Sequence, residues 1–345
     1  MKKVFRFLLK TLFILLALAV IWGIWNRDLV AYGWMQLKGQ LGIVYAARPV
    51  TEVIKDDQVS DSIKIRLKFV EEIRRFAVDS LGLKDSKNYT SFYDQKSKPL
   101  LWVLTASEPF KLKAYHWKFP VVGEVSYKGF FIKEKGLEEE LSIRSLGYDT
   151  DLGPVSAWST LGWFKDPVLS GMLKRSDGGL AELIIHEMTH STLYVKSDVN
   201  FNENLASAIG EAGALKFLIY KYGENSNELN EYILRKEDAD MYSEHMLRAA
   251  AILDTLYQRI EDLEQPLKEK FKSDRIKEIV RALDTVRFHF PKRYLDSFEQ
   301  TLPNNAYFLS FIRYDSQKDE MREELKTRYK QNISAYLEAV RIKYK

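Results

Sequence analysis

The chain has 345 residues, a formal net charge of +4 and no cysteine. Disulfide bonds, thiol catalysis, cysteine-ligated zinc and a lipidated cysteine anchor are therefore excluded. Hydrophobic residues make up 46% of the sequence, which is enough to build the core of one large domain or of two closely packed lobes. The small charge is spread along the chain, and no basic block interleaved with aromatic residues predicts a nucleic-acid partner. The sequence predicts no protein partner either.

The amino terminus carries basic residues ahead of an apolar run from Thr11 to Trp25. Such a run is either a signal peptide or a membrane-spanning anchor. Ala17-Leu18-Ala19 offers a cleavage site, but the apolar run continues beyond it, which favours an uncleaved anchor over residues 1–28. Because the positive charges lie on the amino side, we expect that end in the cytoplasm. The expectation is a single-pass protein of the bacterial cell membrane, with its folded domain in the periplasm or on the outer face.

Residues 29–180 show a mixture of helical and extended patterns. The predicted helices are 29–49, which ends in a turn at Arg48-Pro49, then 60–81 and 135–146; the predicted extended segments are a buried strand at 100–106, a hairpin turning at Gly123-Glu124 between 119–123 and 125–132, and 156–164. These patterns predict a lobe with a small mixed or antiparallel sheet.

Residues 181–345 show only helical patterns. The predicted helices are 180–185 leading into the motif described next, then 203–222, 228–262, 274–287 and 319–344. The expected fold class is therefore α+β and predominantly helical, in which residues 29–345 form one domain of two lobes behind one membrane helix.

A His-Glu-x-x-His motif consists of His186, Glu187 and His190. On a helix, two histidines four residues apart project from one face and can bind one Zn²⁺. Glu187 is then placed to take a proton from water at the metal. Glu203 follows thirteen residues after His190 and is placed to be the third ligand, which leaves the fourth position open. The alternative is a buried helix whose histidines are satisfied by their neighbours; counting Glu203 favours the metal.

The zinc site is expected in the soluble domain. Some intramembrane proteases carry the same motif within a transmembrane helix. Here no second apolar run approaches membrane-spanning length, and the charged Glu182 lies just before the motif.

Several blocks of sequence resemble the gluzincin metallopeptidases, and more closely a family of bacterial proteins described as predicted aminopeptidases. The blocks are Gly39-Gln40-Leu41, Ala47-Arg48-Pro49, Phe119 to Gly123, Tyr127 to Phe131, Gly147-Tyr148-Asp149, Ala157 to Pro167, the motif, Phe201-Asn202-Glu203 and Pro303-Asn304-Asn305-Ala306. The resemblance implies a zincin-like peptidase fold, with His186, His190 and Glu203 as ligands of one zinc ion and Glu187 as the base. The sequence departs from gluzincins in its short connection from His190 to Glu203. It also places Ser207 where many of them have an aspartate that orients a histidine.

The resemblance implies further site residues. Related peptidases bind substrate along an edge strand, and Ser156, Ala157 and Trp158 have the corresponding position; a core strand with a buried tryptophan is the alternative. Asn202 and Ser207 are expected around the ligands.

An oxyanion donor is also expected. Tyr242, His245 and Tyr307 are the candidates, of which the family block favours Tyr307. His116 and His289 sit among aromatic residues and are expected to be structural.

The expected function is zinc-dependent hydrolysis of peptide bonds, by an aminopeptidase in the first instance. An aminopeptidase needs a carboxylate for the substrate's amine, and Asp149, Asp151 and Glu182 are equal candidates, so endopeptidase action stays open. One alternative function is an inactive, zinc-binding scaffold or interaction protein at the membrane. Another is a tethered helical interaction module in which the motif is accidental.

Overall fold

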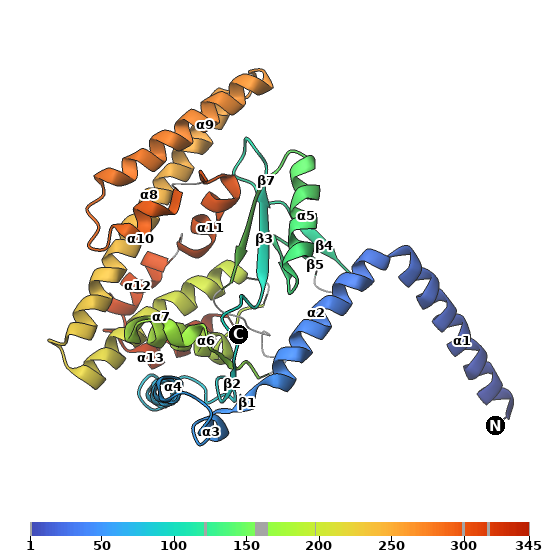
Figure 1. The fold of residues 1–345 in the computed structure, drawn as a ribbon, viewed down its shortest axis with the longest axis horizontal. Helices are drawn as coiled ribbons and strands as arrows, with labels where there is room; N and C mark the ends of the chain where they lie inside the picture. The colour runs from blue at the N-terminus through green and yellow to red at the C-terminus, as the bar shows by residue number, and fades with distance from the viewer. Residues whose placement is uncertain are drawn as a thin grey trace.

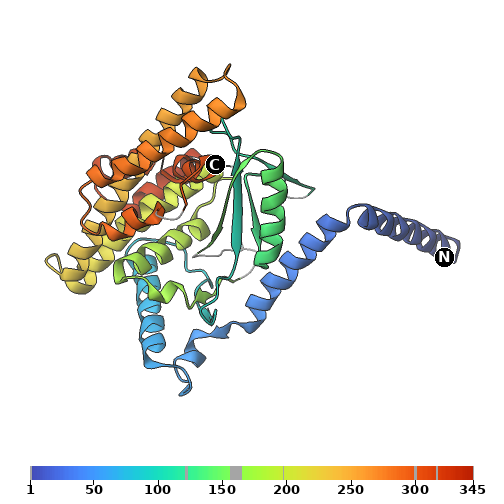
Figure 2. The ribbon, with the colours of Figure 1, turned by 45° about the horizontal axis from the view of Figure 1, so that its top comes forward.

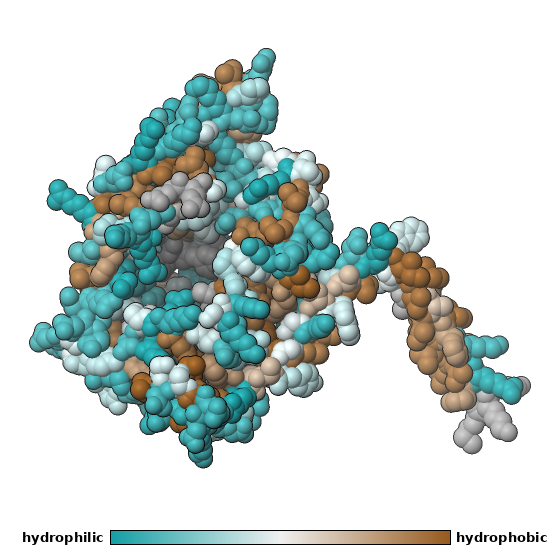
Figure 3. All heavy atoms as spheres, viewed as in Figure 1, coloured by the Kyte–Doolittle hydropathy of each residue, from teal (hydrophilic) through white to brown (hydrophobic). Residues whose placement is uncertain are grey.

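The computed structural model describes residues 2–120, 123–155, 165–196, 198–298, 301–315 and 318–344. Helix α1 (Lys2–Trp25) projects away from the rest of the molecule, and its described surface is apolar along most of its length (Figures 1 and 3). Its segment Val4–Trp25 has the length and composition to cross a membrane and is 0% buried within the structure. A membrane span and a signal sequence both have these properties.

Helix α2 (Arg27–Ala46) follows α1 and connects it to the folded domain (Figure 2). The Tyr32 hydroxyl and the Gln36 amide both donate to the carbonyl of Gly129. Gly39 lies directly against the ring of Phe131, where a Cβ atom would clash. Helix α2 ends at Ala46, three residues before the predicted end, and the single turn α3 (Val50–Val53) that follows was not predicted. Helix α4 (Asp61–Asp79) agrees with the predicted helix 60–81.

Three small sheets accompany the helices. Strand β3 (Trp102–Ser107) lies between β6 (Tyr127–Phe130) and β7 (Asp149–Pro154), and both pairings are antiparallel. A second sheet has the order β1 (Arg48–Pro49), β2 (Ser91–Tyr93) and β8 (Val168–Leu169), and its β2–β8 pair is parallel. Helix α5 (Lys133–Ser145) contacts β3, β6 and β7 and ends before Gly147, whose φ is +87°.

The predicted hairpin at Gly123-Glu124 is wrong. Strand β4 (Trp117–Phe119) pairs with β5 (Gly123–Val125), so the chain reverses before Gly123, and Glu124 faces Lys118 across the pair in a 2.9 Å ion pair. The segment after β5 instead joins β3, where Phe130 is buried. Long-range burial against β3 therefore decides the pairing, and the local turn signal does not.

The carboxyl-terminal half is helical. Its elements are η1 (Met172–Lys174), α6 (Asp177–Thr192), α7 (Val199–Tyr222), α8 (Asn227–Arg259), α9 (Gln265–Ala282), η2 (Leu283–Thr285), α10 (Lys292–Leu295), η3 (Asp296–Phe298), α11 (Asn305–Asp315), α12 (Lys318–Thr327) and α13 (Ile333–Lys343). The predicted helix 274–287 begins earlier, at Gln265, because Pro266 favours the first turn of a helix.

The single predicted helix 319–344 is two helices. Lys330 and Gln331 have φ values of +48° and +64°, which no helix accommodates. Asn332 then accepts a hydrogen bond from the backbone N–H of Ala335 and caps α13. The reversal packs Tyr336 and Leu337 into the main core.

Helices α6 and α7 cross closely because two glycines of α7 face α6. A Cβ atom at Gly210 would lie 2.9 Å from the Glu182 carbonyl oxygen and 3.1 Å from Cβ of His186. At Gly213 a Cβ atom would lie 2.8 Å from Ile185. Only a residue without a side chain permits this approach, so the two glycines set the spacing between the helices.

A buried charge network joins four helices around that crossing. Lys236 of α8 pairs with Glu182 of α6 at 3.0 Å and with Glu211 of α7 at 3.3 Å. Arg322 of α12 pairs with Glu211 and, at 3.0 Å, with Asp240. Burial opposes the ionisation of Glu182, but the Lys236 ammonium outweighs it and lowers the Glu182 pKa. Each charge thus has an opposite partner, and α6 is tied to α7, α8 and α12.

We expect Gly210→Ala to destabilise the fold by about 1–3 kcal/mol and to weaken metal binding, because the added methyl group pushes α7 away from His186. Gly42→Ala in α2 is the matched control, since its Cβ would meet nothing within 4 Å. Alanine is favoured in helices, so the control should be neutral or stabilising by at most about 1 kcal/mol. Urea unfolding measures the stability of both variants. An equal change in the free energy of unfolding for Gly210→Ala and Gly42→Ala would contradict the close crossing.

Candidate metal centre

Two helices bring the three predicted metal ligands together. The Nε2 atoms of His186 and His190 lie 3.2 Å apart, one turn apart on α6. Glu203 of α7 places its carboxylate oxygens 3.5 Å from Nε2 of His186 and 3.7 Å from Nε2 of His190. One ligand atom from each residue lies within 4.8 Å of the others. Within the described ranges, this is the group of metal-binding side chains that the chain assembles.

The geometry of these atoms fits a zinc ion. Zinc binds imidazole nitrogen and carboxylate oxygen at about 2.0–2.2 Å, which in a tetrahedron separates neighbouring ligand atoms by roughly 3.4 Å. The two Nε2 atoms are 3.2 Å apart, and they lie 3.5 and 3.7 Å from different oxygens of the Glu203 carboxylate, so the separations lie on both sides of that value. Two neutral nitrogens and one carboxylate oxygen are also the donor set of a catalytic zinc with one open position.

The pKa values of the two histidines are shifted in opposite directions. Burial, followed by the neighbouring His186, lowers the pKa of His190 to about 4. Burial also acts to lower the pKa of His186, but the hydrogen bond to Glu203 and the carboxylates around it outweigh this and raise it. His190 is therefore neutral at physiological pH and can donate a lone pair to a cation.

Asn202 fixes the connection between the two ligand-bearing helices. Its side chain is buried, accepts a hydrogen bond from the N–H of Val195 at 2.8 Å and donates one to the carbonyl of the same residue at 2.7 Å. Asp198 caps α7 by accepting from the N–H of Phe201. Helix α7 thus begins at Val199, earlier than predicted, and Glu203 lies beyond its first turn. These contacts fasten Val195 to the first turn of α7.

Glu187 is half-buried, and Tyr89 and Asp166 are among the groups that act on its pKa. Burial raises the pKa of the Glu187 carboxyl, the charges of Glu203 and Asp166 add to this, and the Tyr89 hydroxyl acts in the opposite direction. A carboxylate with a raised pKa is a better proton acceptor. Neither Tyr89 nor Asp166 was among the predicted site residues. Asp166 appears in a family block, whereas Tyr89 carries no signal in the sequence.

The predicted oxyanion donors lie in a separate aromatic cluster on α8 and α11. The hydroxyls of Tyr242 and Tyr307 are hydrogen-bonded to each other at 2.7 Å. Nε2 of His245 contacts the carbonyl oxygen of Ile279 at 2.9 Å. No contact in the described part of the chain joins these three side chains to the metal ligands, so the role of Tyr307 stays a prediction.

The remaining predicted site residues are placed as follows. Ser156, Ala157 and Trp158 lie outside the described residues. Ser207 is half-buried one turn after Glu203, and its side chain makes no hydrogen bond within the described ranges. His289 contacts Glu237 at 3.0 Å near the surface, as expected of a structural residue.

Two of the three candidate carboxylates for a substrate amine are already paired. Asp149 binds the Lys272 ammonium and accepts from the backbone N–H of Asn305. Glu182 binds Lys236. Asp151 lies close enough to Tyr307 for its charge to raise the pKa of that hydroxyl. Of the three, Asp151 is the one that no lysine or arginine side chain pairs with in the described structure.

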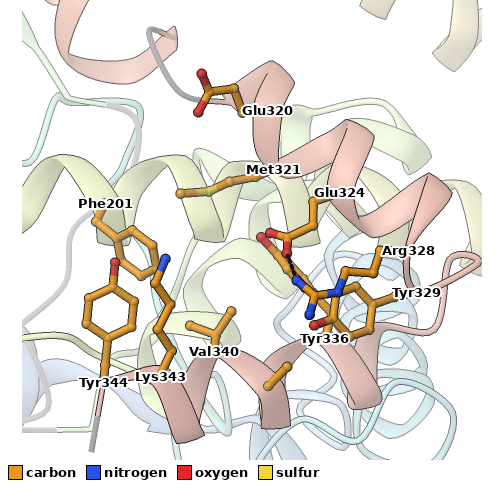
Figure 4. A pocket seen from close by; sticks show the side chains of 11 residues that line it. Phe201, Glu320, Met321, Glu324, Arg328, Tyr329, Tyr336, Val340, Lys343 and Tyr344 are labelled. Atoms are coloured by element: carbon orange, nitrogen blue, oxygen red, sulfur yellow. Dashed lines mark hydrogen bonds and ion pairs between the residues drawn. The ribbon is translucent and has the colours of Figure 1, made fainter.

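A cavity of about 610 Å³ adjoins the start of α7, between α12 and α13. Figure 4 shows Phe201 and Tyr344 at one end of it, and Glu324 paired with Arg328 at the other. Phe201 lies two residues before the proposed metal ligand Glu203. The cavity is lined by neither of the two histidines nor by Glu187. It is therefore a neighbour of the metal centre and not part of it.

Comparison with known proteins places the chain in a family. Residues 31–343 match the family described as "Putative aminopeptidase", and the chain belongs to that family. No curated protein and no solved structure shows a significant match to this chain. The match begins within α2 and extends to the end of α13, so it covers both the sheets and the helical half.

We expect the protein to bind one zinc ion, and His186→Ala, His190→Ala and Glu203→Ala each to reduce its affinity by more than about 100-fold, beyond the loss typical of an outer-sphere partner. Glu187→Gln should bind as the wild type does. Calorimetry of the chelator-treated protein measures this, and zinc at 100 times its dissociation constant should stabilise the fold by about 2.7 kcal/mol. Equal binding by the Glu203 variant would rule that residue out as a ligand.

Proposed function

We propose that the protein is a zinc-dependent peptidase with a zincin-like site of the gluzincin type. The observation that supports this most directly is the convergence of His186, His190 and Glu203 from two helices, with Glu187 beside them. The family description agrees with hydrolysis of peptides. An accidental motif would not bring a third ligand from another helix to within 3.7 Å of the histidines.

Each of these residues has a proposed role in the reaction. His186, His190 and Glu203 hold the metal, which when bound polarises the scissile carbonyl and makes water a stronger acid. Glu187 takes a proton from the attacking water and delivers it to the leaving amine nitrogen, so the products are one carboxylate and one amine. The burial of Glu187 favours the first of these steps, because it makes the carboxylate a better proton acceptor.

Aminopeptidase action requires a carboxylate that the protein itself has not neutralised. Asp149 and Glu182 each bind a lysine, which leaves Asp151 as the proposed partner of the substrate's amine. If Asp151 lies outside the bound substrate's reach, internal cleavage becomes the expected activity.

A zinc-binding scaffold without activity is the second candidate. It is supported by the position of the candidate oxyanion donors, none of which contacts the proposed metal ligands in the described part of the chain. A purely structural zinc site keeps no open position and needs no base, whereas three protein ligands and a buried glutamate are what a catalytic site uses. We therefore favour the enzyme.

We further propose that α1 is an uncleaved anchor of a single-pass bacterial membrane protein, with the domain outside the cytoplasm. Its basic amino end and its apolar length support this orientation. After an alkaline wash, the full chain should stay with the membranes, whereas a chain from residue 29 should be released. A mature protein whose mass corresponds to cleavage after Ala19 would contradict the anchor.

Peptide hydrolysis is tested with the zinc-loaded full chain in detergent and a diverse peptide pool, read by mass spectrometry. We expect stepwise loss of amino-terminal residues. Glu187→Gln should retain zinc but lose at least about 100-fold in rate, because general-base catalysis contributes about that much. Asp151→Asn should raise KM for a free amino terminus and leave blocked peptides unaffected. Zinc binding without cleavage of any peptide would favour the scaffold.

A further inference from the structure

The segment before β2 is fastened to the end of the metal-binding helix α6. The backbone N–H of Lys84 donates to the Thr192 hydroxyl at 2.9 Å. The side-chain amide of Asn88 donates to the Ser191 hydroxyl at 3.1 Å, next to the ligand His190. These contacts bring residues more than 100 positions apart in the sequence beside each other.

Tyr89 is held in this segment with an unusual backbone. Its φ is +60°, in the left-handed region that favours glycine, and its side chain is only 1% exposed. Its N–H donates to the carbonyl of Asp166 at 2.7 Å, and Asn88 accepts from the Asp166 N–H at 3.2 Å. A bulky residue with a strained backbone persists only where its surroundings hold it, and such residues gather at functional sites.

The hydroxyl of Tyr89 has no ordinary partner. It is fully buried and makes no hydrogen bond of normal geometry within the described part of the chain. It nevertheless lies at the carboxylate of Glu187, close enough for each group to shift the pKa of the other. A phenylalanine would fill the same space without leaving a buried donor unsatisfied, so packing alone does not account for the hydroxyl.

We propose that Tyr89 is a positioning residue that donates its hydroxyl hydrogen bond to Glu187 and fixes the orientation of that carboxylate towards the metal. The proposal rests on the proposed function, because Glu187 needs a fixed orientation only as a base.

The protonation of Tyr89 agrees with a donor role. Burial, Glu187 and Asp166 all raise the pKa of its hydroxyl, which therefore keeps its proton at every physiological pH. The hydrogen bond occupies part of the Glu187 carboxylate, which has acceptor sites to spare for the water that it activates. Tyr89 thus acts through Glu187, and Asp166 holds its backbone.

The test compares Tyr89→Phe with a matched control, Tyr336→Phe. Tyr336 is also buried in the main core, but its hydroxyl is hydrogen-bonded to Glu324, which lines the cavity of Figure 4. In the zinc-loaded full chain we expect Tyr89→Phe to bind one metal with an affinity within threefold of wild type. We expect kcat for a cleaved peptide to fall about 10- to 100-fold with KM unchanged within twofold. Tyr336→Phe should match wild type.

A second readout does not depend on activity. The visible absorption of the Co²⁺-loaded protein reports on the surroundings of the metal's open position. Tyr89→Phe should shift these bands, and it should add no further shift to Glu187→Gln, since the two side chains act as one unit.

Three results would overturn the role of Tyr89: a kcat within twofold of wild type, a loss confined to KM, or a cobalt shift that adds fully to that of Glu187→Gln. If wild type cleaves no peptide, the peptidase proposal fails, and the cobalt spectra still decide the role of Tyr89.

Discussion

The close crossing of α6 and α7 determines the geometry of the proposed metal centre. One helix supplies two histidines and the proposed base, and the other supplies the carboxylate of Glu203. The distance between them is set by Gly210 and Gly213, where a side chain would meet the backbone and side chains of α6. Helices usually pack about 8–10 Å apart, and glycine at the contact permits the shorter end of that range. The spacing that a metal requires is therefore a property of the packing.

Ion pairs from neighbouring helices stabilise this crossing, because they neutralise the carboxylates that α6 and α7 place next to it. Lys236 and Arg322 neutralise the carboxylates of Glu182 and Glu211, so α6 and α7 carry acidic groups close to the metal site without repelling each other. Removing one member would leave an uncompensated buried charge, which is strongly destabilising. The network contacts α6 at Glu182, one helical turn before the proposed ligand His186. It ties α6 to α7 and α8 at that point.

The sequence predicts the parts of this site that follow from local periodicity, and not those that follow from long-range pairing. A spacing of four residues places His186 and His190 on one helical face whatever the rest of the chain does. Tyr89 lies near Glu187 through contacts between segments far apart in the sequence, among them the pairing of β2 with β8, and strands this short leave no periodic pattern to recognise. The same cause explains the wrong hairpin at Gly123-Glu124, where pairing with β3 decides the register. It also explains why Lys236 was not expected as the partner of Glu182.

The proposed chemistry requires that two imidazoles and one carboxylate bind a single zinc ion. X-ray absorption spectroscopy of the full chain with one equivalent of zinc tests it most directly. We predict two imidazole nitrogens and two oxygens at about 2.0–2.2 Å in a four-coordinate site, and the loss of one oxygen neighbour in Glu203→Ala. A six-coordinate, all-oxygen environment, or a spectrum that Glu203→Ala leaves unchanged, would contradict the claim.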